Sequence, residues 1–171
     1  MLIEYIDPSS LEIPFQTVSS AIEHYKKKHP TKIAIHSIDQ EVSINFEQLA
    51  YLIDRTAALM IQRGVTRGTR VVILSGECIE KLVLMLASWR CGASACPFHS
   101  EIPQNQLKKI IQTINPAIVI WRTSDLIGEK LTTTLTCPSF NFLSLKDEDG
   151  FFGNLPEEIS SLPPSGEEYG P

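Results

Sequence analysis

The fold is decided by the residues from Arg70 to Pro97, which read RVVILSGECIEKLVLMLASWRCGASACP. Val71 to Leu74 is a continuous, β-branched apolar run, typical of a strand that is covered on both faces of a parallel sheet. A long apolar helix from Glu80 to Trp89 follows, then a glycine exit at Gly92 and a second short strand that Pro97 stops. A strand, a helix and a second strand in this order form a βαβ unit, the building block of open α/β sheets.

The same alternation continues toward the C-terminus. Pro103 fits the first turn of a third helix, and Ala117 to Trp121 is predicted as another buried strand. Weaker patterns predict a helix at Leu126 to Leu135 and a last strand at Phe140 to Leu145. Strands and helices that alternate about every 20 to 25 residues predict an α/β fold, with an open, mostly parallel, doubly wound sheet and helices on both faces.

Three elements are predicted before the decisive stretch. An amphipathic helix carries its apolar positions at helical spacing and ends at Pro30. A small β-hairpin joins two β-rich runs through Asp39-Gln40-Glu41. A second helix begins with a capping box of Asn45 and Gln48 and ends at Arg63 with Gly64 as a left-handed cap. The apolar positions of the first helix are Val18, Ala21, Ile22 and Tyr25, and the two hairpin runs are Ile33 to Ile38 and Val42 to Ile44.

The chain divides into three parts by composition. Residues 1–14 are predicted to be an extended lead-in, residues 15–153 an α/β subdomain, and residues 154–171 a linker or tail rich in Pro, Glu, Ser and Gly. The full chain has 171 residues, which is long enough for one self-sufficient hydrophobic core.

Composition excludes some classes of partner and location. With 43% hydrophobic residues, 20% charged residues and a net charge of −5, the chain resembles an ordinary globular domain without a broad basic face, so nucleic acid is not an expected partner. The basic run Lys26-Lys27-Lys28 is predicted to be a solvated helix end. No apolar stretch approaches the ~20 residues of a membrane span. The absence of a signal-peptide pattern, and four cysteines in or beside buried elements, favour a cytoplasmic protein with reduced thiols.

The cysteines are candidates for metal binding and for nucleophilic chemistry. Cys91, Cys96 and His99 would need a fourth ligand and a common direction to bind zinc, whereas Cys91 at a helix end and Cys96 on a buried strand are expected to point apart. Cys78 lies near a helix N-terminus but has no identifiable base beside it. We therefore interpret the cysteines as structural thiols.

Other polar residues near strand ends have a stronger structural than catalytic interpretation. His99 follows the carboxyl end of a strand, where open α/β sheets bind ligands, but a loop histidine is the better interpretation. Ser75-Gly76-Glu77 offers free backbone amides, yet Glu77 and the absence of a glycine-rich phosphate motif favour a plain connection. Arg90 is expected to anchor a helix end or a carboxylate. Trp89 and Trp121 are predicted to lie in the core, His24, His29 and His36 have no site-forming partner, and no catalytic, cofactor-binding or metal-binding residue is assigned.

Several motifs resemble one enzyme family. Leu86 to Ala93, followed by Pro97, resembles the "LA..R.GA...P" signature of the adenylate-forming enzymes, which include acyl-CoA synthetases, luciferases and the adenylation domains of nonribosomal peptide synthetases. His29 to Ile35 is similar to the family's "P-x-K-x-A" strand, and Ser43 to Leu49 to its "T-Y-x-E-L" motif. Gly64 to Val71 resembles "G-V-x-x-G-D-x-V", with Thr69 in place of the acid. The ordered set extends roughly from residue 15 to residue 125.

Other parts of the family pattern are absent from the sequence. The family holds the ATP phosphates with a Thr/Ser/Gly-rich loop that ends in Pro-Lys. Ser165-Gly166-Glu167-Glu168 is no substitute, because its two carboxylates would repel a triphosphate. The ribose-binding acids, the hinge and the adenylate lysine of the family would also lie beyond the last residue. The resemblance therefore implies an N-terminal piece that is inactive alone and packs against the remainder of the enzyme, while a homodimer stays open.

For the complete enzyme, the resemblance implies a two-step ligase reaction. A carboxylic acid attacks the α-phosphate of Mg·ATP, and the thiol of CoA or of a carrier protein then takes the acyl group. ATP, Mg²⁺ and CoA belong to the parent enzyme, and none is expected in this piece. The compact first segment is compatible with a small acyl-CoA ligase of the o-succinylbenzoate–CoA ligase type. The alternative is a stand-alone, flavodoxin-like binding or interaction module without catalysis.

Overall fold

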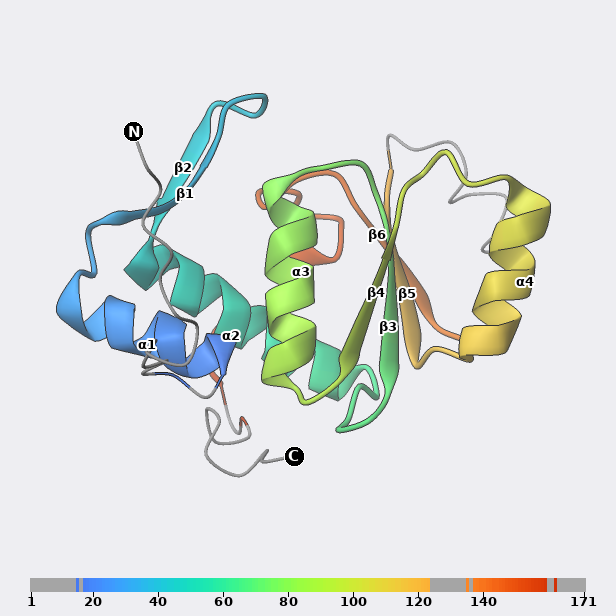
Figure 1. Ribbon diagram of the computed structural model, residues 1–171, viewed down its shortest axis with the longest axis horizontal. Coiled ribbons are helices and arrows are strands. Elements are labelled where there is room, and N and C mark those ends of the chain that lie inside the picture. The colour runs from blue at the N-terminus through green and yellow to red at the C-terminus, as the bar shows by residue number, and fades with distance from the viewer. Residues whose placement is uncertain (1–14, 16, 124–134, 136, 160–161, 163–171) are drawn as a thin grey trace, which may run out of the picture.

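The helices and strands follow the order that the sequence predicts (Figure 1). The computed structural model describes residues 15, 17–123, 135, 137–159 and 162. The predicted helix at Leu126 to Leu135 therefore falls almost wholly outside the described residues. The elements are α1 (Val18–Lys28), β1 (Ile33–Ser37), β2 (Val42–Asn45), α2 (Phe46–Gln62), β3 (Arg70–Leu74), α3 (Ile79–Arg90), β4 (Ser94–Phe98), α4 (Gln104–Ile114), β5 (Ile118–Arg122), β6 (Ser139–Phe142) and η2 (Phe152–Asn154).

Four strands form one parallel sheet in the order β4-β3-β5-β6. The central strand β3 places Val71 beside Ala95 of β4 on one side and beside Ile118 of β5 on the other. Both central strands are buried, because helices cover the two faces of the sheet. The predicted α/β class with an open parallel sheet is confirmed.

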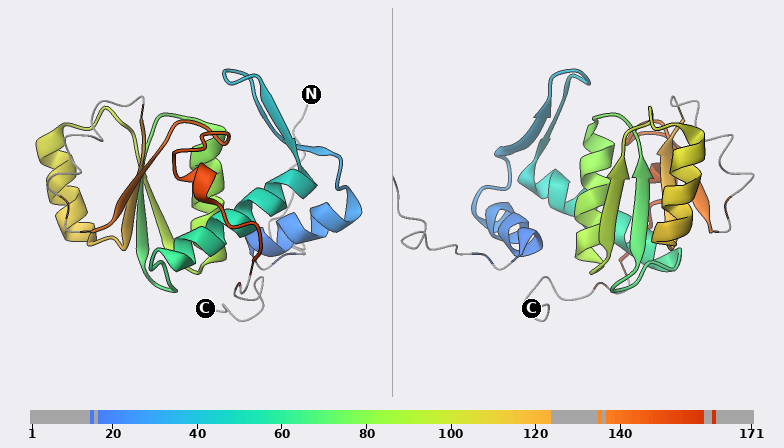
Figure 2. Two further views of the ribbon diagram at one scale, coloured as in Figure 1. Left: turned by 180° about the vertical axis from the view of Figure 1, so that it is seen from behind. Right: turned by 45° about the vertical axis from the view of Figure 1, so that its right-hand side comes forward.

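The two faces of the sheet carry separate clusters of buried side chains. Val71 and Ile73 face α2 and α3 and join the larger cluster, which includes Met60 and Val83. Alternate residues of the same strands point the other way and form a second cluster. α4 covers this face of the sheet (Figure 2). Full burial of an aliphatic side chain stabilises the fold by about 1.5–3 kcal/mol. The second cluster comprises Val72, Leu74, Leu107, Ile111, Val119 and Trp121.

Local cap chemistry sets the ends of α2. The Asn45 side chain accepts a hydrogen bond from the Gln48 amide at 2.8 Å, and the Gln48 side chain accepts one from the Asn45 amide at 3.0 Å. This is the predicted capping box, and such a cap contributes about 1 kcal/mol. Beyond the helix, Gly64 takes a φ of 92°, the left-handed conformation that glycine adopts without strain.

The predicted hairpin is also present. β1 and β2 pair antiparallel, and His36 Nδ1 lies 2.7 Å from the Ser43 hydroxyl across the pair. The hairpin projects from the α1–α2 side of the molecule, and its tip lies at the same end as the N-terminus of α3 (Figure 1).

Pro97 does not stop β4, contrary to the sequence-based prediction. The amide of Ser94 donates to Thr69, and the carbonyl of Phe98 accepts from Ser75, so these alternate residues of β4 face β3. Pro97 lies between these residues, so its backbone nitrogen faces the open edge of the sheet instead of β3. Proline is tolerated there because no neighbouring strand needs an N–H from it. Because β4 lies at an edge, Cys96 is half-buried rather than buried.

The prediction of two core tryptophans is half right. Trp121 is 7% exposed, but Trp89 is 43% exposed. Trp89 lies on the same helical face of α3 as Leu82 and Met85, which are only half-buried. The opposite face of the helix carries the buried residues Val83, Leu84, Ala87 and Ser88.

β6 ends before the predicted boundary at Leu145. The Thr123 amide makes the final ladder bond to the Phe142 carbonyl. The next free amides are taken by side chains, since Leu143 donates to the Asp147 carboxylate and Leu145 to the Glu80 carboxylate. The chain then returns over α2 as a strap, which we define as residues 150–156.

Candidate functional site

The strand order of the sheet reverses at β3. The chain runs from β3 through α3 on one face to β4, and then from β4 through α4 on the opposite face to β5, on the other side of β3. In open α/β folds with this order, the ligand crevice lies outside the carboxyl ends of the first and third strands, which here are β3 and β5. The candidate site is therefore the carboxyl edge of the sheet around β3, where its neighbours β4 and β5 also end.

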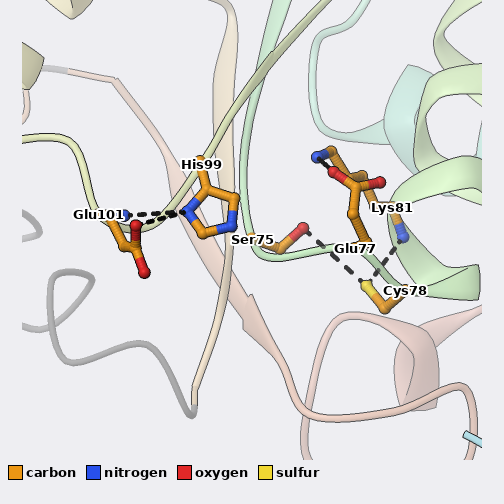
Figure 3. A network of polar contacts seen from close by, with 6 residues as sticks. All are labelled: Ser75, Glu77, Cys78, Lys81, His99 and Glu101. Atoms are coloured by element: carbon orange, nitrogen blue, oxygen red, sulfur yellow. Dashed lines mark hydrogen bonds and ion pairs between the residues drawn. The ribbon is translucent and has the colours of Figure 1, made fainter. Parts of the chain in front are cut away.

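Two groups of polar side chains flank this edge (Figure 3). After β3, the buried Ser75 lies 4.0 Å from the Cys78 thiol, and Lys81 forms a 2.6 Å ion pair with Glu77. After β4, His99 Nδ1 lies 3.9 Å from the Glu101 carboxylate. The structure thus brings His99 to the same sheet edge as the Ser75-Gly76-Glu77 turn.

Charge at this edge follows from burial and pairing. The hydrogen bond and the charge of Lys81 lower the pKa of Glu77, so this carboxyl is ionised at neutral pH. Burial raises the pKa of the Cys78 thiol, which outweighs its position at the N-terminus of α3. Cys78 is therefore a neutral thiol at pH 7, which supports its interpretation as a structural residue.

The N-terminus of α3 does not fit a phosphate. The Ile79 amide already donates to the Gln40 side chain at 2.7 Å, and the Lys81 amide donates to the Cys78 sulfur at 3.4 Å. Glu80, which is 2% exposed, and Glu77 add two carboxylates to the same turn. A triphosphate or its Mg²⁺ complex would meet occupied amides and like charge. The interpretation of this turn as a plain βα connection stays a prediction, which these two hydrogen bonds support.

Cys91 and Cys96 lie on opposite faces of the sheet. Cys91 packs in the α2–α3 cluster, and its thiol donates to the Ala57 carbonyl at 3.5 Å. Cys96 packs in the cluster under α4, so the two side chains point apart, as expected. Burial raises the pKa of Cys91 to about 12. Among the residues that the structure describes, no three His, Cys, Asp or Glu side chains gather as metal ligands.

Arg90 anchors a carboxylate, as predicted. Its Nε lies 3.0 Å from Asp54 Oδ1, and both side chains are largely buried between α3 and α2. The pair joins the two helices that cover one face of the sheet. The basic run Lys26-Lys27-Lys28, which the sequence predicts to be a solvated helix end, lies in the last turn of α1. There the positive charges interact favourably with the negative end of the helix dipole.

Sequence reasoning missed Gln40 and Glu80, whose hydrogen bonds connect the hairpin to the N-terminus of α3. One signal was available, because Glu80 shares a helical face with Val83 and Ala87 and so was placed to be buried. Gln40 lies in a turn and carries no comparable pattern.

Every helix in the described part of the chain is too short or too polar to cross a bilayer.

Comparisons with known proteins connect this fold to an enzyme family. The family model described as "AMP-binding enzyme" matches residues 22–160, most of the chain. The chain belongs to the AMP-binding enzyme family. The resemblance to the adenylate-forming enzymes is thereby confirmed, and the match continues past residue 125, where the sequence motifs end.

Curated relatives of this AMP-binding chain are much longer proteins. Tenellin synthetase of Beauveria bassiana is 25% identical over 152 residues, which cover 84% of this chain and 4% of the synthetase. The fatty acid–[acyl-carrier-protein] ligase MmaC of Mycobacterium marinum is 25% identical over 112 residues, or 66% of this chain and 21% of the ligase. The chain thus spans a small part of the proteins that it matches.

A solved structure shows the same fold. The fatty acyl CoA synthetase of Mycobacterium tuberculosis superposes with a TM-score of 0.72 at 16% identity, over 88% of this chain and 30% of the synthetase. At this identity the likeness establishes the fold alone. The four parallel strands and the hairpin of this AMP-binding chain correspond to the N-terminal subdomain of the adenylate-forming fold.

Proposed function

We propose that the chain is the N-terminal part of an ATP-dependent acid–thiol ligase. One observation carries this proposal: the AMP-binding family match extends over residues 22–160, a range whose described part contains the β4-β3-β5-β6 parallel sheet. In this proposal residues 15–153 form the α/β subdomain and residues 154–171 lead onward to the remainder of the enzyme. That remainder is the expected packing partner.

The complete enzyme would join a carboxylic acid to a thiol in two steps. The carboxylate oxygen attacks the α-phosphorus of ATP and expels pyrophosphate, so that an acyl-adenylate forms. A thiol then attacks the acyl carbon, and AMP leaves with the bridging oxygen. Mg²⁺ supplies charge neutralisation for the phosphates in such a reaction, and positioning of the two reactants supplies much of the rate.

This chain would contribute the scaffold and one wall of the active site, whereas the residues that bind the nucleotide would lie in other parts of the enzyme. Its turn at the N-terminus of α3 has occupied amides and two carboxylates, which argues against phosphate binding there. The Cys78 thiol is protonated, which argues against a nucleophile at the switch point. We therefore propose that the 171-residue chain alone does not form adenylates.

The acid and the acceptor thiol are inferred only as classes. MmaC is named for a fatty acid and an acyl carrier protein, and the synthetase of M. tuberculosis for fatty acyl CoA. These names support a carboxylic acid with either a carrier-protein thiol or CoA as acceptor. A cytoplasmic location remains a prediction. The o-succinylbenzoate type and the homodimer remain predictions. The competing non-catalytic module is less well supported, because the family match covers both the sheet and the hairpin.

Pyrophosphate release tests the proposal. The protein would be extended through its own reading frame, where that frame continues past Pro171, and supplied with Mg·ATP and a panel of carboxylic acids. We expect acid-dependent pyrophosphate release from the extended protein and none from the 171-residue chain. A folded extended protein that turns over no acid would refute the ligase. Turnover by the 171-residue chain would instead refute our proposal that the nucleotide-binding residues lie in other parts of the enzyme.

A further inference from the structure

The Gln40 side chain ties the hairpin tip to α3. Gln40 Oε1 accepts the Ile79 amide at 2.7 Å, and Gln40 Nε2 donates to Glu80 Oε2 at 2.9 Å. Gln40 thus caps α3 from a position 39 residues earlier in the chain. Two residues therefore cap the N-terminus of α3. Cys78 accepts from the Lys81 amide, and the distant Gln40 accepts from the Ile79 amide.

The Glu80 carboxylate gathers a third segment. Its other oxygen, Oε1, accepts the amide of Leu145, which lies just after the carboxyl end of β6. Glu80 is 2% exposed, and its two described hydrogen bonds come from neutral donors. A buried carboxylate depends on such donors, because an unpaired charge away from water is costly. The charged groups next to these residues in the sequence are Asp39 and Glu41 on the hairpin, Glu77 and Lys81 on the α3 turn, and Lys146 and Asp147 after β6. The charge of Arg122, at the end of β5, acts on the neighbouring Cys78.

We propose that Gln40 and Glu80 form a brace that locks the hairpin and the exit of β6 onto the N-terminus of α3. The brace lies at the carboxyl edge of the sheet, beside the switch point. Gln40 and Glu80 thus hold three segments together at this edge, and the hairpin is fixed to α3 rather than a free arm. The inference stands on the fold and does not depend on the ligase activity.

The chemistry of the brace requires an amide opposite a carboxylate. Gln40 accepts with one atom and donates with the other, which neither a glutamate nor a methionine side chain can do at neutral pH. Little else fixes the tip itself, since Ile38 beside it is 79% exposed and Glu41 is exposed. Two-stranded hairpins are marginally stable alone, so the tip should depend on this tie.

A donor–acceptor exchange tests the brace in the full 171-residue chain. Gln40→Glu places two carboxylates in contact, and Glu80→Gln leaves one donor facing another. The double variant Gln40→Glu/Glu80→Gln restores all three bonds. Its new carboxylate on the hairpin accepts from the Ile79 amide and from the new side-chain amide on α3, whose oxygen accepts from the Leu145 amide.

The three variants have distinct expected stabilities. We expect each single variant to raise the unfolding equilibrium constant roughly 10- to 100-fold at pH 7. The double variant should recover at least half of the lost free energy of unfolding, which is proportional to the logarithm of this constant. The reason is that hydrogen-bond donors again face acceptors. Glu41→Gln is the matched control for charge on the exposed part of the hairpin, and it should leave the constant nearly unchanged.

The pH profile separates the brace from a general packing defect. In Gln40→Glu the paired carboxylates hold a proton more tightly in the folded state, so the loss of stability should be smallest near pH 4 and grow toward pH 7. Additive losses in the double variant, or a loss that does not vary with pH, would overturn the brace.

Amide exchange covers the case in which the charge variants fail to fold. Gln40→Met keeps the length of the side chain but removes both polar atoms. We expect hydrogen exchange at the Ile79 amide to accelerate at least about tenfold, because its acceptor is gone. Unchanged protection of Ile79 in a folded Gln40→Met protein would contradict the proposal.

Discussion

The Cys91 thiol illustrates how burial sets chemistry at the scale of one residue. It is 2% exposed, and its pKa rises to about 12 because the thiolate would lose its hydration. The same effect raises the pKa of Cys78, Cys96 and Cys137, so each is less reactive than an ordinary thiol. The sequence indicated structural cysteines from their apolar neighbours, and the structure supplies the physical reason.

Alkylation measures this effect directly. Because the pKa of Cys91 rises from an ordinary 9.0 to about 12, its thiolate fraction at pH 8 falls about 1,000-fold. We expect iodoacetamide to label Cys91 at least that much more slowly in the native protein than in urea, as followed by peptide mass spectrometry. Comparable rates in the two states would show that Cys91 is accessible and ionisable.

Two glycines provide a matched pair for a second prediction. A Cβ added at Gly153 would collide with the backbone carbonyl of Glu148, whereas one added at Gly76 would meet no atom within 4 Å. Gly153→Ala should therefore lower the free energy of unfolding by about 2 kcal/mol or more, and Gly76→Ala should change it by less than about 1 kcal/mol. Urea denaturation measures both, and equal effects would contradict the observed path of the strap.

At the scale of elements, sequence rules succeed where the cause is local. The Asn45–Gln48 capping box and the Gly64 cap depend on neighbouring residues, so the ends of α2 were predictable. Pro97 was misjudged because a sequence does not say which strand lies at an edge. Gln40 and Glu80 were missed as a pair, because 40 positions separate them in the chain. Long-range polar contacts leave no periodic pattern.

The strap is held by another long-range contact. Arg55 Nε donates to the Pro156 carbonyl at 2.6 Å and Nη2 to the Leu155 carbonyl at 2.9 Å, while Nη1 donates to the Tyr51 hydroxyl at 2.8 Å. The planar fork of arginine can reach both carbonyls together, and lysine cannot reproduce it.

Arg55→Lys should therefore loosen the end of the strap without unfolding the sheet. We expect a loss of about 1–2 kcal/mol in local stability, seen as faster hydrogen exchange over residues 150–159. Tyr51→Phe removes one hydroxyl partner but neither carbonyl contact, and it should have a smaller effect. A strap that exchanges equally in Arg55→Lys and in the unmodified protein would not be held by this arginine.

At the scale of the whole molecule, the parallel sheet was predictable because repeated strand–helix spacing carries the topology. The switch point between β3 and β5 follows from the strand order, which only the structure supplies. The chain belongs to the AMP-binding enzymes, yet its described part presents filled amides and carboxylates where a phosphate could otherwise bind. This combination supports the scaffold role that we propose for the chain.

Oxygen transfer from the acid tests that role most directly. The extended protein would be given Mg·ATP, a thiol acceptor and a carboxylic acid that carries oxygen-18 in its carboxyl group. If the carboxylate attacks the α-phosphorus, AMP must leave with one labelled oxygen, which mass spectrometry detects. We predict labelled AMP together with unlabelled pyrophosphate. Label in inorganic phosphate, or thioester formation with unlabelled AMP, would contradict the adenylate-forming account of this chain.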